Sequence, residues 1–261
     1  MADSSLEQRV MRERLAHDED DVLERSEQLK ARFSHVQQTL AHRRADTIQA
    51  ALIEEMKGGQ VLDYGCGRGW TSLIYLAAGA AKVFGIDISS AYVREAALAC
   101  AAAGFASDRF EFRAMDAHAL QFPDAAFDFV IGRGILHHLE LAVAIPEIQR
   151  VLKPGGRAIF LEPLADNPLL RLFRKMTPKA RTLDERPLTA ADLDLVSRDF
   201  VGETYFFGLV TAPVAMVTSV MTPRSPHNGL ARAADRLEDW IRRRGWLNSW
   251  HQYALLVLRK P

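Results

Sequence analysis

The segment from Val61 to Gly69, which reads Val-Leu-Asp-Tyr-Gly-Cys-Gly-Arg-Gly, constrains the fold of this chain more than any other segment. Its apolar half predicts a buried strand, and its three glycines predict a tight turn that leads into a helix. Glycine has no Cβ, so such a turn lets the backbone approach a small molecule closely. A buried parallel sheet opens its ligand crevice at this end of its strands. The segment therefore predicts a ligand site at the carboxyl edge of a parallel sheet.

The sequence around this turn alternates short apolar runs with helical segments rich in alanine. Such alternation predicts an α/β fold, with a parallel sheet, right-handed crossovers and helices on both faces. We expect strands near 60–64, 82–88, 110–115, 127–131, 157–162, 203–210 and 251–259, and helices near 71–78, 90–103, 141–152 and 230–244.

The core domain is expected to carry helical additions. Residues 1–57 predict an N-terminal helical extension that serves as a lid, because apolar positions such as Leu29 and Phe33 recur every three or four residues among charges. Residues 58–261 then form the core domain, with capping segments at about 163–200 and 211–247. The first capping segment contains Thr189-Ala190-Ala191-Asp192, the pattern of a helix-capping box.

Composition excludes some partners. Lys plus Arg and Asp plus Glu number 33 each, so no global positive field attracts nucleic acid, and we expect no nucleic-acid partner. Cys66 and Cys100 lack the spacing of a metal or redox site, so no metal is expected. The N-terminus is too charged for a signal peptide, which favours a cytoplasmic location. Nothing in the sequence predicts the oligomeric state.

The stretch 204–223 contains no charged residue and is long enough to span a bilayer. Gly208 and Pro213 interrupt it, and its first half alternates as a strand does. We therefore favour a buried strand followed by a lid helix over contact with a membrane surface. A stable membrane span is the least favoured interpretation.

Two aspartates follow later strands of the predicted sheet. Asp87 ends the second strand, 22 residues after Gly65, where a carboxylate can accept hydrogen bonds from both hydroxyls of a ribose. Asp116 follows the third strand, where it could accept a hydrogen bond from an adenine amino group. The glycine turn with Asp87 is far more specific for a nucleoside cofactor than either feature alone.

Together these segments resemble the class I S-adenosylmethionine-dependent methyltransferases, in particular the small-molecule branch that includes quinone-biosynthesis enzymes. The resemblance covers 60–164 and is carried by Val61–Gly69, Gly85–Ser89, Asp116-Ala117, Phe127–Ile131, Leu136-His137-His138-Leu139 and Leu152–Arg157. It implies a Rossmann-like seven-stranded, mostly parallel sheet whose last strand is antiparallel, and S-adenosylmethionine as the cofactor.

The resemblance also assigns parts of the cofactor to residues. It places Asp63 and the glycines near the methionine part, Asp87 on the ribose, and Asp116 with Ala117 at the adenine. The expected cofactor-binding residues are Asp63, Tyr64, Gly65, Cys66, Gly67, Gly69, Asp87, Ile88, Asp116, Ala117 and Gly132.

A dinucleotide-dependent oxidoreductase is the alternative with the same kind of sheet. A dinucleotide fingerprint needs its third glycine at position 70, where the helix packs beneath a pyrophosphate, and Trp70 occupies this position. The chain also lacks the Tyr-x-x-x-Lys pair of one large dehydrogenase group. The spacing therefore favours S-adenosylmethionine.

Candidate catalytic residues follow the fourth and fifth strands. Methyl transfer depends mainly on alignment, but a hydroxyl or acidic carbon must also lose a proton, and neutral histidine is the natural base near pH 7. His137 and His138 lie in the right neighbourhood, and we favour His137, although either could instead cap the next helix or line the pocket. Glu162 could orient the base or the acceptor, or simply mark a strand end.

The acceptor is expected to be a small molecule. Asn167-Pro168-Leu169-Leu170 is not the signature of amino-methylating nucleic-acid enzymes, and Cys66 in the glycine turn is a poor nucleophile. Tyr205, Phe206, Phe207, Met216 and Met221 could form an apolar acceptor surface, or could pack in the core. We therefore predict methylation of a small hydrophobic metabolite, with oxygen favoured over nitrogen or carbon. A noncatalytic cofactor- or partner-binding protein of the same fold is the alternative.

Overall fold

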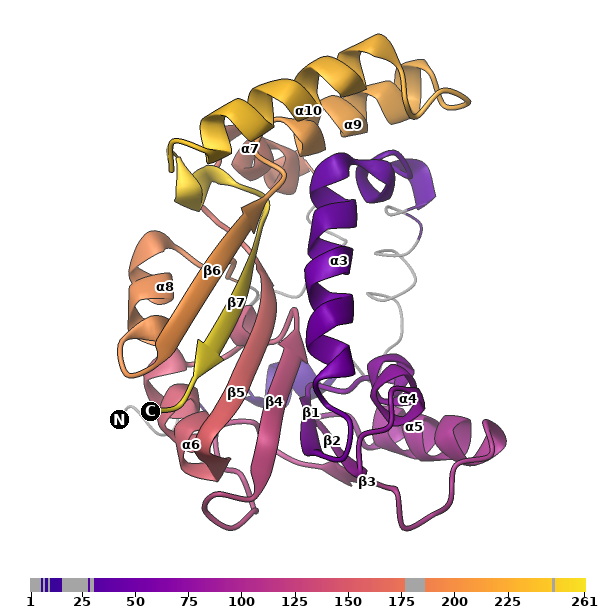
Figure 1. Ribbon diagram of the computed structural model, residues 1–261, viewed down its shortest axis with the longest axis vertical. Helices are drawn as coiled ribbons and strands as arrows, with labels where there is room; N and C mark the ends of the chain where they lie inside the picture. The colour runs from indigo at the N-terminus through magenta and orange to yellow at the C-terminus, as the bar shows by residue number, and fades with distance from the viewer. Residues whose placement is uncertain are drawn as a thin grey trace.

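The computed structural model describes Leu6, Gln8, 10–15, Gln28, 31–176, 186–245 and 247–261. Within these residues, seven strands form one sheet in the order β3-β2-β1-β4-β5-β7-β6. The strands are β1 (Gln60–Tyr64), β2 (Lys82–Asp87), β3 (Phe110–Ala114), β4 (Phe127–Arg133), β5 (Leu152–Pro163), β6 (Val201–Phe207) and β7 (Tyr253–Arg259). β1 to β5 pair in parallel, and β7 lies antiparallel between β5 and β6 (Figure 1). The Rossmann-like α/β sheet with an antiparallel last strand is confirmed.

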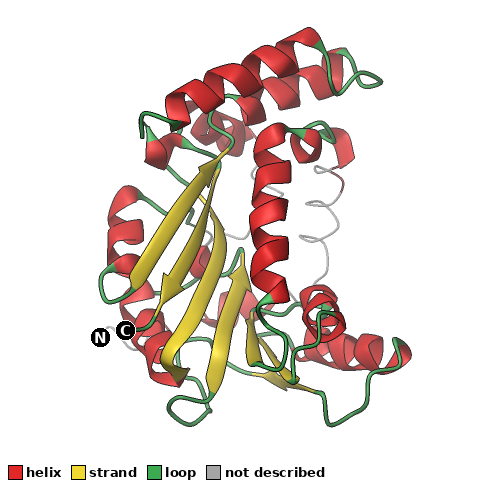
Figure 2. Cartoon of the chain, viewed as in Figure 1, coloured by secondary structure: helices red, strands yellow, loops and turns green. Residues whose placement is uncertain are grey.

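Helices cover both faces of the sheet (Figure 2). One face packs against α3 (Leu40–Glu54), α4 (Trp70–Ala77) and α5 (Ser90–Ala102), which share an apolar cluster with Val61 and Ile131. The other face packs against α6 (Leu141–Val151) and α8 (Ala190–Ser197), whose apolar side chains meet Leu62 and Phe160. The central strands β1 and β4 are therefore buried on both faces, as their nearly continuous apolar residues predict.

The ends of two strands differ from the predicted ends. β6 stops at Phe207 instead of 210 because Gly208 adopts a φ of +84°, which ends the extended backbone. β5 begins at Leu152 instead of 157, because Leu152 pairs with Phe127 across an irregularity that precedes the regular pairing at Arg157. The predicted capping box is confirmed: Thr189 and Asp192 bond reciprocally and start α8.

The uncharged stretch 204–223 forms the end of β6, which is half-buried up to Phe207, and then α9 (Thr211–Met221). The order of strand and helix agrees with the favoured interpretation, and the lid role of the helix stays a prediction. None of the helices in the described part of the chain is both long enough and apolar enough to cross a membrane. The expected acceptor surface is not formed here: Phe207 is buried in the core, and Tyr205 and Phe206 pack against it.

The N-terminal extension does not act as one unit. Residues 10–15 are helical, while residues 16–27 and 29–30 of the expected helices lie outside the described part. α3, by contrast, buries Ala41, Ala45 and Leu52 in the sheet core. The lid prediction therefore does not fit α3, which is part of the core, and it concerns only the residues before it.

Candidate functional site

A cavity of about 800 Å³ opens at the carboxyl edge of β1 to β4. This volume lies in the range of ligand pockets for small molecules. Eight of the eleven expected cofactor-binding residues line it: Asp63, Gly65, Cys66, Gly67, Asp87, Ile88, Asp116 and Ala117. The structure thus brings together residues from three strand ends, the first and last of which, Asp63 and Asp116, are 53 residues apart in the sequence.

Three expected cofactor-binding residues, Tyr64, Gly69 and Gly132, do not line the cavity and support it from behind. Tyr64 is fully buried, and its hydroxyl donates a hydrogen bond to the Ala117 carbonyl at 2.5 Å. A Cβ on Gly69 would lie 2.7 Å from the Cβ of Ala96, so this glycine lets α4 approach α5. A Cβ on Gly132 would lie within 3 Å of two neighbouring side chains. These three residues therefore pack behind the cavity, and their contact with the cofactor stays a prediction.

The glycine turn is fastened to β2 by hydrogen bonds. The backbone N–H groups of Gly67 and Ser89 donate to the two carboxylate oxygens of Asp87, at 2.9 and 3.0 Å. Gly65 and Cys66 both donate to the Ile86 carbonyl. Each carboxylate oxygen can accept more than one hydrogen bond, so Asp87 can still accept from ligand hydroxyls.

Asp63 lies at the floor of the cavity with only 2% of its surface exposed. It accepts hydrogen bonds from Ser72 Oγ at 2.5 Å and Thr71 Oγ1 at 2.8 Å. Burial raises the pKa of Asp63 to about 6, against these hydrogen bonds and the positive charge of Arg133, which lower it. The carboxylate is therefore ionised at neutral pH and would favour a cationic group above it.

Asp116 is held by His118, a residue that the sequence analysis did not single out. The His118 backbone N–H and Nδ1 both lie within hydrogen-bond distance of Asp116 Oδ1, at 2.9 and 2.7 Å. His118 Nε2 accepts from the Glu140 backbone N–H, so the proton resides on Nδ1 and points at the carboxylate. Partial burial raises the pKa of Asp116, but the bonds from His118 outweigh it and the pKa lies below its usual value. Asp116 is thus a fixed hydrogen-bond acceptor.

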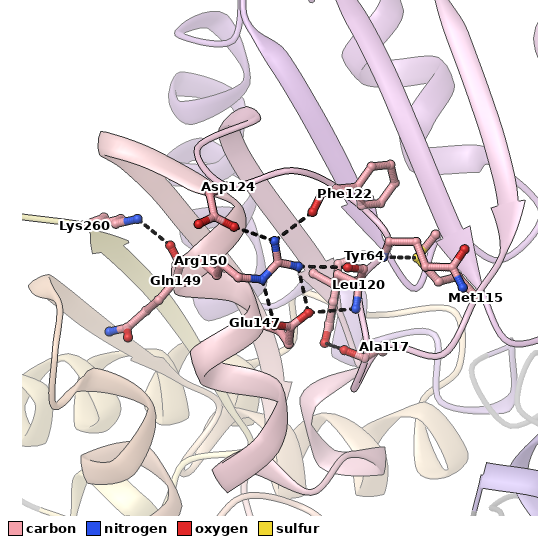
Figure 3. Close-up of polar contacts among 11 residues, drawn as sticks. Tyr64, Met115, Ala117, Leu120, Phe122, Asp124, Glu147, Gln149, Arg150 and Lys260 are labelled. Carbon is pink, nitrogen blue, oxygen red and sulfur yellow. Dashed lines mark hydrogen bonds and ion pairs between the residues drawn. The ribbon is translucent and has the colours of Figure 1, made fainter.

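The loop that carries Asp116 and Ala117 is clamped from below by Arg150 of α6 (Figure 3). The Arg150 guanidinium donates to the carbonyl oxygens of Leu120 and Phe122 and to the carboxylates of Asp124 and Glu147. Glu147 in turn accepts from the Leu120 backbone N–H at 2.8 Å. The position of the loop is therefore set by a network that no local sequence motif reveals.

Of the three candidate catalytic residues, His137 and Glu162 do not line the cavity. Glu162 is fully buried and lies 2.8 Å from His137 Nδ1. It also accepts the backbone N–H groups of Ile135, Leu136 and His137. The preference for His137 as the base therefore does not fit the geometry, because its ring is held inside the protein by a carboxylate that shapes the turn after β4.

His138 lines the cavity, and its Nδ1 lies 3.2 Å from Glu13 Oε2 of the N-terminal helical segment. The two side chains are 14% and 10% exposed. Of the two histidines, His138 is thus the one whose side chain faces the cavity.

Two further lining residues were not among the predicted site residues. Arg133 ends β4 and lines the cavity, and no hydrogen bond or ion pair joins its side chain to the described residues. Trp70, the first residue of α4, lines the cavity and is 73% exposed, so it lies at the rim. Among the described residues, no cluster of His, Cys, Asp and Glu could hold a metal ion.

Residues 62–160 match a family model described as a methyltransferase domain. This segment is similar to methyltransferase domains. It includes Asp63, Asp87, Asp116 and His138, and therefore most of the cavity. The N-terminal segment with Glu13 and the helices after β5 lie outside the match.

Two curated relatives match less than half of this chain. The chain is 38% identical over 109 residues to 27-O-demethylrifamycin SV methyltransferase of Amycolatopsis mediterranei, covering 41% of this chain and 40% of that protein. It is 36% identical over 123 residues to demethylmenaquinone methyltransferase of Staphylococcus aureus, covering 46% and 48%. The chain thus spans less than half the length of the curated relatives it matches.

Solved structures share the fold over most of this chain. The [4+2]-cyclase SpnF matches with a TM-score of 0.55 at 24% identity, covering 84% of this chain and 82% of that one. Geranyl diphosphate C-methyltransferase from Streptomyces coelicolor A3(2) matches with a TM-score of 0.59 at 16% identity, covering 84% and 78%. At these identities the likeness concerns the fold alone, and it extends well beyond residues 62–160.

Proposed function

We propose that this protein is an S-adenosylmethionine-dependent methyltransferase that acts on a small, hydrophobic acceptor. The observation that carries the proposal is the order of groups along one cavity: the glycine turn, then Asp87, then Asp116. Their hydrogen bonds leave Asp87 able to accept from a ribose and hold Asp116 beside Ala117 for an adenine. The methyltransferase domain contains all of these residues.

The charges at the far end of the cavity fit the methionine part of this cofactor. Asp63 and Arg133 lie close enough for the arginine to lower the pKa of the aspartate, yet no ion pair joins them among the described residues. An amino-acid group carries one ammonium and one carboxylate, which match one carboxylate and one guanidinium. We expect Arg133 to bind the carboxylate of the cofactor.

The other side of the cavity fits an apolar acceptor with an ionisable group. Ile135, Leu139 and Val10 line it beside His138. The names of the relatives also support a small acceptor, because they refer to 27-O-demethylrifamycin SV and demethylmenaquinone. We favour a hydroxyl as the methylated group, because His138 is placed to take a proton.

The chain would promote the reaction by alignment and by proton removal. S-adenosylmethionine would supply the methyl group, with cleavage of its sulfur–carbon bond and release of the thioether. As the acceptor oxygen forms its bond to carbon, His138 Nε2 would take the hydroxyl proton. Glu13 would stabilise the resulting imidazolium, and the apolar lining would exclude water.

Calorimetry with S-adenosylmethionine and S-adenosylhomocysteine tests the cofactor. Both should bind, and Asp87→Ala should weaken binding by roughly two orders of magnitude, because two charge-assisted hydrogen bonds to the ribose are lost. Asp108→Ala, an exposed aspartate outside the cavity, is the matched control. Binding of NAD in place of either compound would contradict the proposal and favour an oxidoreductase.

An acceptor screen separates an enzyme from a noncatalytic binding protein. Hydrophobic phenols, quinols and macrocyclic alcohols would be incubated with S-adenosylmethionine, and S-adenosylhomocysteine would be measured. Turnover with a hydroxyl acceptor is expected. Tight cofactor binding without turnover of any acceptor would instead favour the noncatalytic alternative.

A further inference from the structure

The outermost helices, α9 and α10 (Gly229–Arg242), lie side by side beyond the end of β6 (Figure 1). They bury small or polar residues and expose large apolar ones. α9 buries alanines, threonines and Ser219, and α10 buries Ala234 and Glu238. The exposed side chains are 48–72% accessible and comprise Val217, Val220, Met221, Leu230, Leu237 and Trp240. This is the reverse of the usual arrangement in a surface helix.

Hydrogen bonds on the inner side fix this orientation. Glu238 accepts the backbone N–H groups of Gly208, Val210 and Thr211, at 2.8, 3.0 and 2.8 Å, and the Thr211 hydroxyl at 2.7 Å. His35 Nδ1 lies 3.0 Å from the Thr218 hydroxyl, and the His35 backbone N–H donates to Ser219 Oγ at 3.1 Å. Rotation of α10 to bury its leucines would leave a buried carboxylate and several N–H groups without partners, so the apolar face stays outside.

Acidic and basic side chains also lie on different sides of α10. Its three acids are turned toward the protein: Asp235 accepts from the Leu40 N–H, Glu238 is buried, and Asp239 pairs with Arg44 of α3. The exposed charged residues on and just after α10 are all arginines, namely Arg232, Arg236, Arg242, Arg243 and Arg244. α9 has no charged residue. The outer surface therefore combines an apolar stripe with cations.

We propose that the outer face of α9 and α10 binds the surface of an anionic lipid bilayer. A helix with leucine and tryptophan on one side and arginines beside them matches the pattern of helices that lie in the interface of a membrane. Anionic headgroups attract each arginine near the surface, and the apolar side chains enter the headgroup boundary. The proposal concerns contact with one leaflet and is independent of the reaction in the cavity.

A second copy of the chain is a poorer occupant of this face. In a two-fold symmetric contact the same patch meets itself, so arginines of one copy would face arginines of the other. Asp239 already pairs with Arg44 of α3 and with Arg242 and Arg243 of the same copy. Asp235 and Glu238 are turned inward, so no acid on α10 remains to meet the arginines of a second copy. The excess of exposed cations over exposed acids instead complements phosphate-bearing lipids.

Sedimentation with vesicles tests the proposal. The full chain should bind vesicles of phosphatidylcholine mixed with phosphatidylglycerol, bind pure phosphatidylcholine at least roughly tenfold more weakly, and dissociate as NaCl is raised. Leu237→Glu combined with Trp240→Glu should lower binding by more than about tenfold, because apolar side chains no longer enter the interface. Arg232→Gln with Arg236→Gln should remove most of the preference for anionic vesicles.

The matched control is Leu98→Glu, which changes a leucine that is 70% exposed on α5, away from this face. It should leave vesicle binding unchanged, and thermal unfolding followed by circular dichroism should show that all variants fold. Equal loss in Leu98→Glu, or no binding of the unchanged chain to anionic vesicles, would overturn the proposal. A dimer in solution that Leu237→Glu dissolves would assign the face to a second copy and would overturn it as well.

Discussion

Two histidine–glutamate pairs lie next to each other after β4, with the histidine rings 4.2 Å apart, yet they face different environments. His137 and Glu162 are buried, and the Glu162 carboxylate accepts hydrogen bonds from backbone N–H groups. His138 and Glu13 face the cavity, and the glutamate comes from a segment more than a hundred residues away. The comparison indicates that the His137–Glu162 pair stabilises the turn after β4, whereas the His138–Glu13 pair lines the cavity.

The largest effect is expected from His138→Asn. Loss of a general base should lower kcat by roughly 100- to 10,000-fold with little change in the midpoint of thermal unfolding. Kinetics with an acceptor found in the screen, and a melting curve, measure both quantities. His137→Asn is the control, and its kcat should change by less than roughly tenfold. Equal losses of kcat in the two variants would contradict the different roles assigned to His138 and His137.

Glu162→Ala should act on stability. It leaves three backbone N–H groups and His137 without their buried acceptor, which should lower the free energy of unfolding by roughly 3–5 kcal/mol. Urea denaturation measures the change. Glu162→Gln keeps one carboxamide oxygen and should cost less. If Glu162→Ala unfolds normally but loses catalysis, the carboxylate takes part in the reaction and the structural role assigned to this pair is wrong.

Asp63 sharpens the comparison, because it is a buried carboxylate that also lines the cavity. Its pKa is 3.8 in the unfolded chain and about 6 in the folded protein. Between about pH 4 and 6 the folded protein therefore binds the Asp63 proton more tightly than the unfolded chain does. The free energy of unfolding should therefore fall as the pH rises from about 4 to 6, by up to about 3 kcal/mol. Denaturation across this range should show a smaller fall for Asp63→Asn; identical slopes would contradict the assignment.

The smallest effect is expected from Glu13→Gln, which removes the charge beside His138. Stabilisation of the imidazolium weakens, so kcat should fall by roughly tenfold, or about 1.4 kcal/mol, while the KM for the cofactor stays unchanged. Steady-state kinetics with varied cofactor give both values. A rise in KM at constant kcat would show that Glu13 serves binding and not proton transfer.

The sequence predicted those parts of the site that depend on local geometry. A glycine turn after an apolar strand and an aspartate at the next strand end need only neighbouring residues, and Gly65, Gly67 and Asp87 indeed line the cavity. The choice between His137 and His138 could not be made in this way. The two residues differ only in partners from distant segments, and those partners depend on how the whole chain packs.

The orientation of α10 was equally hidden from sequence. The spacing of Leu230, Leu237 and Trp240 predicts an amphipathic helix, and by pattern alone its leucines would face inward. The inward face is chosen by Glu238, which caps the turn before α9. A single buried carboxylate with several backbone donors thus outweighs the apolar pattern of the helix.

The place of β7 in the sheet has a consequence for how the protein is made. β6 pairs only with β7 in the sheet, and β7 follows it after two helices. The ribosome synthesises the chain from its N-terminus, and domains fold as they emerge. β6 therefore has no strand to pair with until β7 has been synthesised. Until then its unpaired backbone groups are open to chaperones and to pairing with other chains.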